Sequence, residues 1–171
     1  MSDNVGTVTD LPQDDVRAFH RKFVTGITVV TTMAAGTPYG LALNAFASVS
    51  VDPATILVCV ATSSSTHDVL VRTSRFAVNL LAHDQLSVAQ RFATKSSDKF
   101  ADIEWFTGEF GSPVLAGSCA HLEAETVEKI PASTHTVFFG RVLRAASTDT
   151  APLVYSESAF FDGSALTPAR P

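Results

Sequence analysis

The sequence of 171 residues has few of the features that usually reveal a function. Its only two cysteines, Cys59 and Cys119, lie in apolar, strand-like stretches, so we expect reduced, buried thiols rather than a disulfide. Lys and Arg form no cluster and the formal net charge is −5, which argues against a nucleic-acid partner. No apolar run approaches the roughly 18 residues that span a bilayer, and the start lacks a secretory signal. We therefore expect a cytoplasmic protein without membrane contact.

Motifs for several kinds of chemistry are also missing. The five histidines show no H-x-H, H-E-x-x-H or C-x-x-C pattern, so the sequence predicts no metal site. No G-x-S-x-G is present, which disfavours a hydrolase. Without G-x-G-x-x-G or a P-loop, any bound nucleotide is not held by a Rossmann or P-loop turn. Glu123 and Glu125 are two residues apart on a predicted strand, and we expect both on a solvated face.

The composition is that of a globular protein, with 46% hydrophobic and 17% charged residues and a mean hydropathy of +0.21. At this length one domain is expected, over residues 12–171, after a flexible tail of residues 1–11. A helix is predicted to follow Pro12, with Val16, Phe19 and Phe23 on one face.

A second helix is predicted over residues 83–93, with Leu86, Ala89 and Ala93 on one side. Ser65 and Asp68 have capping-box spacing and predict the start of a short helix. Residues 96–113 contain too many Gly and Pro breaks for regular structure, so a long surface loop is expected.

The remaining segments favour strands, because they are rich in β-branched residues and bounded by turn residues. The order of elements predicts a mainly β, α+β fold of the barrel type with a few covering helices, and not a doubly wound parallel sheet. The predicted strands are 27–34, 39–50, 54–61, 75–81, 118–130, 134–147 and 152–161.

Hydroxyl and amide side chains gather where consecutive strands end: Asn44, Ser48 and Ser50, then residues 62–66. Such groups before a helix can bind an anion, and Arg91 could add a bidentate contact to a phosphate. From spacing alone, helix capping and turn formation explain these serines more simply, and Arg91 is then a surface charge.

Seven blocks follow one another along the chain: FVTGITVVTT, GTPYGLALNAFASVSVDPATILVCV, SSSTHDVL, RFAVNLLAHDQLSVAQRFA, KFADIEW, GSPVLAGSCAHLEAE and THTVFFGRV. In sequence and order they resemble the flavin reductase-like family, the short-chain NAD(P)H:flavin oxidoreductases that serve two-component flavin-dependent monooxygenases. The resemblance extends from about Val16 to Tyr155.

The resemblance implies a split β-barrel that binds FMN or FAD, usually as a homodimer whose partner helps to close the flavin site. It places residues 44–48 along the isoalloxazine and ribityl parts, residues 61–66 at the ring edge and phosphate, and residues 91–92 at the tail. The cofactor-binding residues that it implies are Asn44, Ala45, Phe46, Ala47, Ser48, Ala61, Thr62, Ser63, Ser64, Ser65, Thr66, Arg91, Phe92, His135 and Phe160.

His135 falls where the family has a histidine associated with the nicotinamide cofactor, commonly within Gly-Asp-His; here the triplet is STH. A polar residue at a strand start is the alternative interpretation of His135. The family often has hydroxyl side chains where this chain has Ala42, Ala45 and Ala47, and Pro in place of Ala54. Contacts made through the backbone would survive these changes, whereas contacts through hydroxyls would not.

The implied reaction is hydride transfer from NADH or NADPH to N5 of free FAD or FMN, after which a partner monooxygenase receives the reduced flavin. No catalytic acid or base is required, because the two cofactors supply the chemistry. Two alternatives remain: a flavoenzyme that holds its flavin tightly and acts on a small substrate, and a flavin-binding protein without reductase activity.

Overall fold

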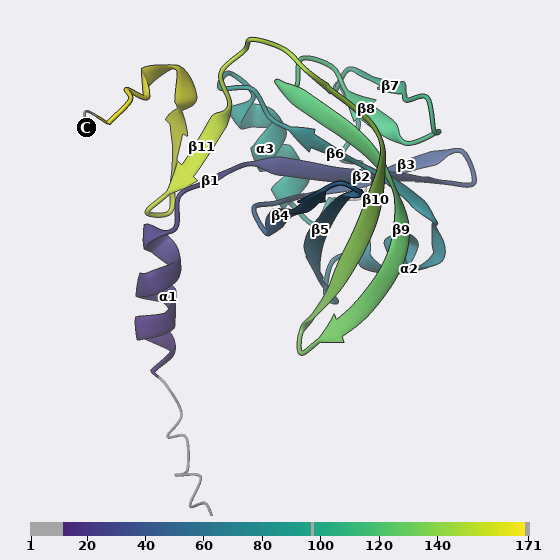
Figure 1. Cartoon of the computed structure of the whole chain (residues 1–171), viewed down its shortest axis with the longest axis horizontal. Helices are drawn as coiled ribbons and strands as arrows, with labels where there is room; N and C mark the ends of the chain where they lie inside the picture. The colour runs from purple at the N-terminus through teal and green to yellow at the C-terminus, as the bar shows by residue number, and fades with distance from the viewer. Residues whose placement is uncertain (1–11, 97, 170–171) are drawn as a thin grey trace, which may run out of the picture.

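The computed structural model describes residues 12–96 and 98–169. Strands are the main regular element of this part of the chain, and a few short helices are arranged around them (Figure 1). The predicted tail, residues 1–11, lies outside the described residues. The helices are α1 (Gln13–Lys22), α2 (His67–Arg72), α3 (Leu86–Ala93) and the 3-10 helix η1 (Gly163–Ala165).

Most of the regular elements of the structure are strands, as the sequence predicts. The hairpin of β2 and β3 turns at Ala35 and Gly36, where the sequence predicts a turn. The strands are β1 (Thr25–Gly26), β2 (Thr28–Ala34), β3 (Thr37–Leu43), β4 (Phe46–Val51), β5 (Ala54–Ala61), β6 (Arg75–Leu80), β7 (Trp105–Thr107), β8 (Pro113–Leu115), β9 (Ala120–Ala132), β10 (His135–Ser147), β11 (Leu153–Ser156) and β12 (Ala159–Asp162).

The main sheet has seven antiparallel strands in the order β3-β2-β6-β9-β10-β5-β4. The prediction of a mainly β fold with few helices is therefore confirmed. Hydrogen bonding between the described strands does not close the sheet, because β3 and β4 each keep one free edge. Two smaller sheets, β1-β11-β12 and β7-β8, complete the fold.

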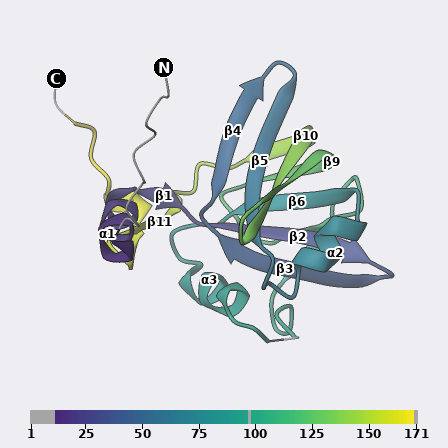
Figure 2. The same ribbon diagram turned by 90° about the horizontal axis from the view of Figure 1, so that it is seen from below.

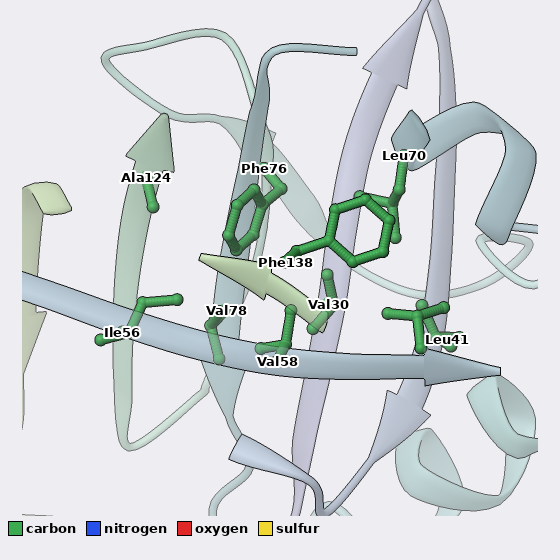
Figure 3. Packing of buried hydrophobic residues seen from close by; sticks show 10 residues of the cluster. Val30, Leu41, Ile56, Val58, Leu70, Phe76, Val78, Ala124 and Phe138 are labelled. Carbon is green, nitrogen blue, oxygen red and sulfur yellow. The ribbon is translucent and has the colours of Figure 1, made fainter. Parts of the chain in front are cut away.

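One face of the main sheet encloses the larger hydrophobic core (Figure 3). Gly140 on β10 is required there, since a Cβ at this position would lie 2.8 Å from Cζ of Phe76. Side chains from β2, β3, β5, β6, β9, β10 and α2 contribute to this core: Val30, Leu41, Ile56, Val58, Val60, Leu70, Phe76, Val78, Ala124 and Phe138.

The second core lies where α3 packs beside β2 and β3 (Figure 2). Ala89 and Phe92 are the buried residues of α3, whereas the predicted Leu86 and Ala93 are exposed. A Cβ at Gly40 of β3 would lie 2.7 Å from Cε1 of Phe92. Glycine at this position therefore lets α3 approach the edge strand closely.

α1 stands apart from the main sheet and lies beside β1 and β11 (Figures 1 and 2). The helix is confirmed, yet none of its residues is buried, and Phe19 and Phe23 are 75% and 70% exposed. Its end is attached to the β11–β12 turn, where Glu157 N donates to the carbonyl of Arg21 at 2.9 Å and Lys22 pairs with Glu157. Within residues 12–96 and 98–169, the apolar face of α1 is therefore left uncovered.

The prediction of a loop over residues 96–113 is wrong in part, because residues 105–107 pair with residues 113–115 as β7 and β8. The loop joining them packs over β9 and buries Glu123, which is only 2% exposed. Its carboxylate accepts hydrogen bonds from Phe110 N at 3.0 and 3.1 Å and from Ser112 N at 3.1 Å. The prediction that Glu123 lies on a solvated face is therefore wrong.

The capping box predicted at Ser65 and Asp68 is also wrong. α2 begins after Thr66, and no side chain caps its first turn. Instead, Ser64 Oγ accepts a hydrogen bond from Thr66 N at 3.3 Å. The hydroxyl that accepts a backbone hydrogen bond here therefore belongs to Ser64, one residue before the Ser65 that the spacing indicated.

Both cysteines are free thiols, as predicted. Cys119 is buried, and burial raises the pKa of its thiol. Cys59 is only half-buried, because β5 buries alternate residues on one face rather than its whole length.

Candidate functional site

A groove runs along the free edge of β3, between this strand, residues 61–66 and α3 with the residues that follow it. Three cavities lie in series within it: an apolar cavity of about 280 Å³, a central cavity of about 190 Å³ and a hairpin cavity of about 250 Å³. Ala42 and Ala93 belong to both the apolar and the central cavity, and Ser65 and Lys99 to both the central and the hairpin cavity. The three hollows therefore form one elongated site.

The apolar cavity has aromatic and small walls. Tyr155 of β11 and Phe160 of β12 have ring centroids 5.2 Å apart in an edge-to-face arrangement. Ala42 and Ala89 add short side chains, and Asn44 adds an amide. Flat aromatic groups with polar atoms at one edge match such a surface.

Lys99 is the unusual residue of the central cavity, because its side chain carries an ammonium group yet the residue is only 7% exposed. Its Nζ donates to the carbonyl oxygens of Gly40 at 3.1 Å and Phe92 at 3.2 Å. Among residues 12–96 and 98–169 no carboxylate pairs with it, and burial lowers its pKa. Neutral carbonyls compensate a buried cation only in part, so an anion in the cavity would be favoured.

Hydroxyl groups surround this ammonium group. Ser63 and Ser65 line the central cavity together with Lys95, and the structure records no hydrogen bond for either hydroxyl within the described chain. Both serines and Lys95 are exposed to solvent. Free hydroxyls beside two ammonium groups can bind a phosphate.

The serine-containing segment 61–66 is held firmly at both ends. Thr62 N donates to the carbonyl of Thr134 at 2.9 Å, which attaches the segment to the start of β10. Thr66 Oγ1 donates to the carbonyl of Gly40 at 2.9 Å, which attaches it to β3. These bonds fix the serines between the β9–β10 turn and the edge strand β3.

Residues 44–48 comprise the two-residue connection after β3 and the start of β4, and they are exposed throughout. Asn44 lines the apolar cavity, and Ala45 accepts a hydrogen bond from Cys59 N at 3.0 Å, so this bend is anchored to β5. Phe46 lines a different hollow, described below, and Ala47 and Ser48 line none of the three cavities. Small side chains nonetheless leave the backbone here open to close approach.

His135 is exposed at the start of β10 and is the registered partner of Ala61. Side chains of paired residues in an antiparallel ladder point to the same face of the sheet. His135 itself lines none of the three cavities, but it shares a face of the sheet with Ala61, which lines the central cavity. Its Nδ1 lies 3.0 Å from Thr134 Oγ1.

Arg91 and Phe92 have different positions relative to the groove. Phe92 is buried, and it contributes to the wall of the central cavity. Arg91 lines none of the three cavities; its Nη1 donates to the carbonyl of Ala101 at 3.4 Å. A contact between Arg91 and a phosphate would require the side chain to leave this position.

Sequence reasoning missed several groove residues, chiefly Lys95, Lys99 and Tyr155. The stretch TKSSDK offered a signal, since two lysines and two serines follow a predicted helix. The burial of Lys99 could not be foreseen, because it arises when β3 and α3 meet around that side chain.

None of the described residues that line the groove is Asp or Glu, so these walls would not repel an anion. No group of three or more His, Cys, Asp and Glu side chains that could hold a metal occurs in the described part of the chain. None of the helices in residues 12–96 and 98–169 is both long and apolar enough to cross a membrane.

The family comparison agrees with the resemblance seen in the sequence. A family model described as "Flavin reductase like domain" matches residues 19–164, which is most of the chain. The chain therefore belongs to the flavin reductase-like family.

Two curated relatives illustrate the range of the family. The reductase component of the flavin-dependent trigonelline monooxygenase of Acinetobacter baylyi is 38% identical over 157 residues. These cover 91% of this chain but only 49% of that protein, so the chain spans about half of its length. The FMN reductase (NADH) SmoA of Agrobacterium fabrum is 40% identical over 138 residues, which cover 81% of this chain and 79% of SmoA.

The solved structures include a close match in shape. The NADH:FAD oxidoreductase SgcE6 of Streptomyces globisporus, in complex with NAD and FAD fragments, superimposes with a TM-score of 0.84 at 33% identity. The match covers 92% of this chain and 96% of that chain.

Proposed function

We propose that this protein reduces FAD or FMN with NADH or NADPH and releases the reduced flavin to a separate flavin-dependent monooxygenase. The observation that carries this proposal is the ammonium group of Lys99, buried without a carboxylate partner in the described chain at the centre of the groove. The naming of several relatives as reductase components of monooxygenases supports the choice of partner.

Along the groove an apolar cavity is followed by a polar, positively charged one, and a flavin nucleotide has the same order of chemical groups. A flavin has a flat, largely apolar ring system at one end and a phosphorylated tail at the other. The apolar cavity with Tyr155 and Phe160 would accept the ring, and the central cavity with Ser63, Ser65 and Lys99 would accept the phosphate. Asn44 lies at the ring end, where its amide can bond the ring's polar edge.

When bound, the flavin accepts a hydride at N5 from the nicotinamide. The chain's own residues would bind and orient the two cofactors rather than exchange protons, which agrees with a groove that no carboxylate of the described residues lines. The short side chains of Ala42 and Ala89, which line the apolar cavity, would leave room for the ring. His135, on the same face of the sheet as Ala61, is the residue that we expect at the nicotinamide.

The direct test follows oxidation of NADH and NADPH by the purified protein with added FMN, FAD or riboflavin. Rapid turnover that requires added flavin supports the proposal. Turnover that requires another substrate, by a protein that retains flavin through purification, would replace it with a tightly bound flavoenzyme. Flavin binding without any nicotinamide oxidation would contradict reductase activity altogether.

We also propose a homodimer and the split-barrel form of the fold. Two apolar surfaces support the dimer: the exposed face of α1, with Phe19 and Phe23, and a trough of about 320 Å³ on the main sheet, lined by Phe46, Leu80 and Leu122 among others. A second copy would cover both. The bond between Thr66 and Gly40, which joins the segment after β5 to the edge strand β3, supports the barrel.

Light scattering coupled to size-exclusion chromatography tests the dimer. Wild-type protein should have twice the chain mass, and replacing both Phe19 and Phe23 by Ser should shift it towards the monomer. The double substitution is well suited because neither residue is buried within the chain. A wild-type monomer at every concentration would contradict the proposal.

A further inference from the structure

The groove does not end at Lys99. Beyond the central cavity it continues into the hairpin cavity, which lies along the β2–β3 hairpin and includes Tyr39, Ser96 and Phe100 in its wall. Because Ser65 and Lys99 belong to both cavities, a phosphate bound by them would lie at the boundary. FMN ends with that phosphate and would leave the hairpin cavity without a ligand.

The hairpin cavity has the chemistry of a purine site. Tyr39 and Phe100 supply aromatic surface, while Thr37 and Ser96 supply hydroxyls. Bases stack on aromatic side chains, and ribose hydroxyls and ring nitrogens bond to hydroxyl groups. The described residues that line the cavity include no acid, so they would not repel a pyrophosphate at its entrance.

Phe100 forms a fixed wall for this cavity. Its ring packs edge to face against Phe92, with centroids 5.0 Å apart, and against Trp105, at 5.8 Å. Lys99, next to it in the chain, is tied to β3 and α3 through two carbonyls. Since an ammonium group has three donors, one remains for a bridging phosphate. The wall and the entrance of the cavity are thus held in place by contacts within the chain.

The size of the groove also favours a dinucleotide. Each cavity alone is smaller than the roughly 300 to 1,000 Å³ of a typical small-molecule site, whereas the three in series fall within that range. We propose that the hairpin cavity binds the adenosine half of FAD, with Tyr39 and Phe100 as its aromatic walls, so that the protein prefers FAD to FMN. This inference rests on the proposed flavin reduction.

An adenosine diphosphate group occurs in both FAD and NADH, so the test must separate the two. The Michaelis constants for FAD, for FMN and for NADH with FMN as acceptor should be measured for wild type and Tyr39→Ala. Loss of one stacking surface should raise the constant for FAD about tenfold and leave the other two within about twofold. A rise in the constant for NADH with FMN as acceptor would assign the cavity to the nicotinamide cofactor and overturn the inference.

Two further variants guard against a trivial loss of structure. Ser96→Trp places a large side chain in the cavity from an exposed position, so it should weaken the binding of FAD but not the binding of FMN. Tyr39→Phe keeps the ring and should behave as wild type. Phe106→Ala removes an exposed aromatic residue outside the groove and should change nothing. Equal Michaelis constants for FAD and FMN in wild type would contradict the inference.

Calorimetric titration with ADP provides a readout that needs no turnover. Wild type should bind ADP, and Tyr39→Ala and Ser96→Trp should each weaken this binding about tenfold. If the protein oxidises no NAD(P)H with either flavin, the proposed reaction fails while the titration still examines the cavity. Absence of ADP binding in a protein that reduces FMN would reject only the adenosine site.

Discussion

The hydroxyl of Thr66 donates a 2.9 Å hydrogen bond to the carbonyl oxygen of Gly40, and this bond joins the segment after β5 to the edge strand β3. The same carbonyl accepts from Nζ of Lys99 at 3.1 Å. One backbone oxygen therefore holds two walls of the groove together. Gly40 can be approached in this way because its missing Cβ leaves room for Phe92.

Removing the Thr66 hydroxyl should loosen the groove and the fold together. Thr66 is buried, so Thr66→Val should lower the free energy of unfolding by about 1 kcal/mol. The Michaelis constant for flavin should rise as well, because residues 61–66 lose their attachment to β3. Thr66→Ser retains the hydroxyl and serves as the control. Denaturant unfolding with flavin titration measures both effects, and equal values for the two variants would contradict the role of this bond.

Lys99→Met should weaken binding of the phosphorylated flavins selectively. A hydrogen bond to a charged group contributes roughly 1.5 to 3 kcal/mol, so the dissociation constant for FMN should rise about ten- to a hundredfold. Riboflavin lacks the phosphate and is the matched ligand, so its constant should stay nearly the same. Fluorescence titration measures both. A parallel loss for riboflavin would place Lys99 at the ring rather than at the phosphate.

The lowered pKa of Lys99 predicts opposite effects of pH on stability and on binding. The folded protein releases this proton at a lower pH than the unfolded chain does, so the unfolded state binds more protons between the two pKa values. The stability of the flavin-free protein due to Lys99 therefore increases as pH rises to the usual lysine pKa and falls as pH drops.

FMN affinity should change in the other direction, because the phosphate needs the protonated amine. Affinity should decline as pH rises through the folded pKa of Lys99, which lies below that of an ordinary lysine. Lys99→Met should remove this decline and the stability slope together. Titrations and unfolding curves across the alkaline range measure them, and an unchanged decline in the variant would exclude Lys99 as its source.

Glu123 should matter for stability and not for flavin reduction. Its buried carboxylate accepts bonds from Phe110 N and Ser112 N, so Glu123→Gln should lower the free energy of unfolding by roughly 2 kcal/mol. Glu125→Gln disrupts an exposed pair with Arg141 and should cost less than about 1 kcal/mol. Chemical denaturation compares the two. Equal costs would contradict the burial of Glu123.

Strands and helices were predictable where local pattern and burial agree. The β-branched run of β2 and its turn at Ala35 and Gly36 predicted the hairpin, and the spacing of apolar residues predicted α1. The prediction of a capping box at Ser65 was wrong because this spacing does not decide which residue begins a helix. In the structure α2 begins after Thr66.

Only the part of the groove formed by residues 61–66, directly after β5, could be predicted from the sequence. Ser63 and Ser65 stand out in the sequence and do line the central cavity. Glu123 was predicted on a solvated face and Lys99 was not singled out, because the burial of both depends on contacts that the local sequence does not show. Lys99 is covered where β3 meets α3, and Glu123 where the β7–β8 loop folds onto β9.

β3 is an edge of the main sheet, and an uncovered edge strand is a template on which other chains can add strands and aggregate. In this protein Thr66 and Lys99 occupy an outward carbonyl of that edge, and α3 packs alongside it. The groove thus protects the strand from misassembly as well as offering a ligand site. Substitutions that disrupt the groove should therefore make the protein more prone to aggregate, separately from any effect on turnover.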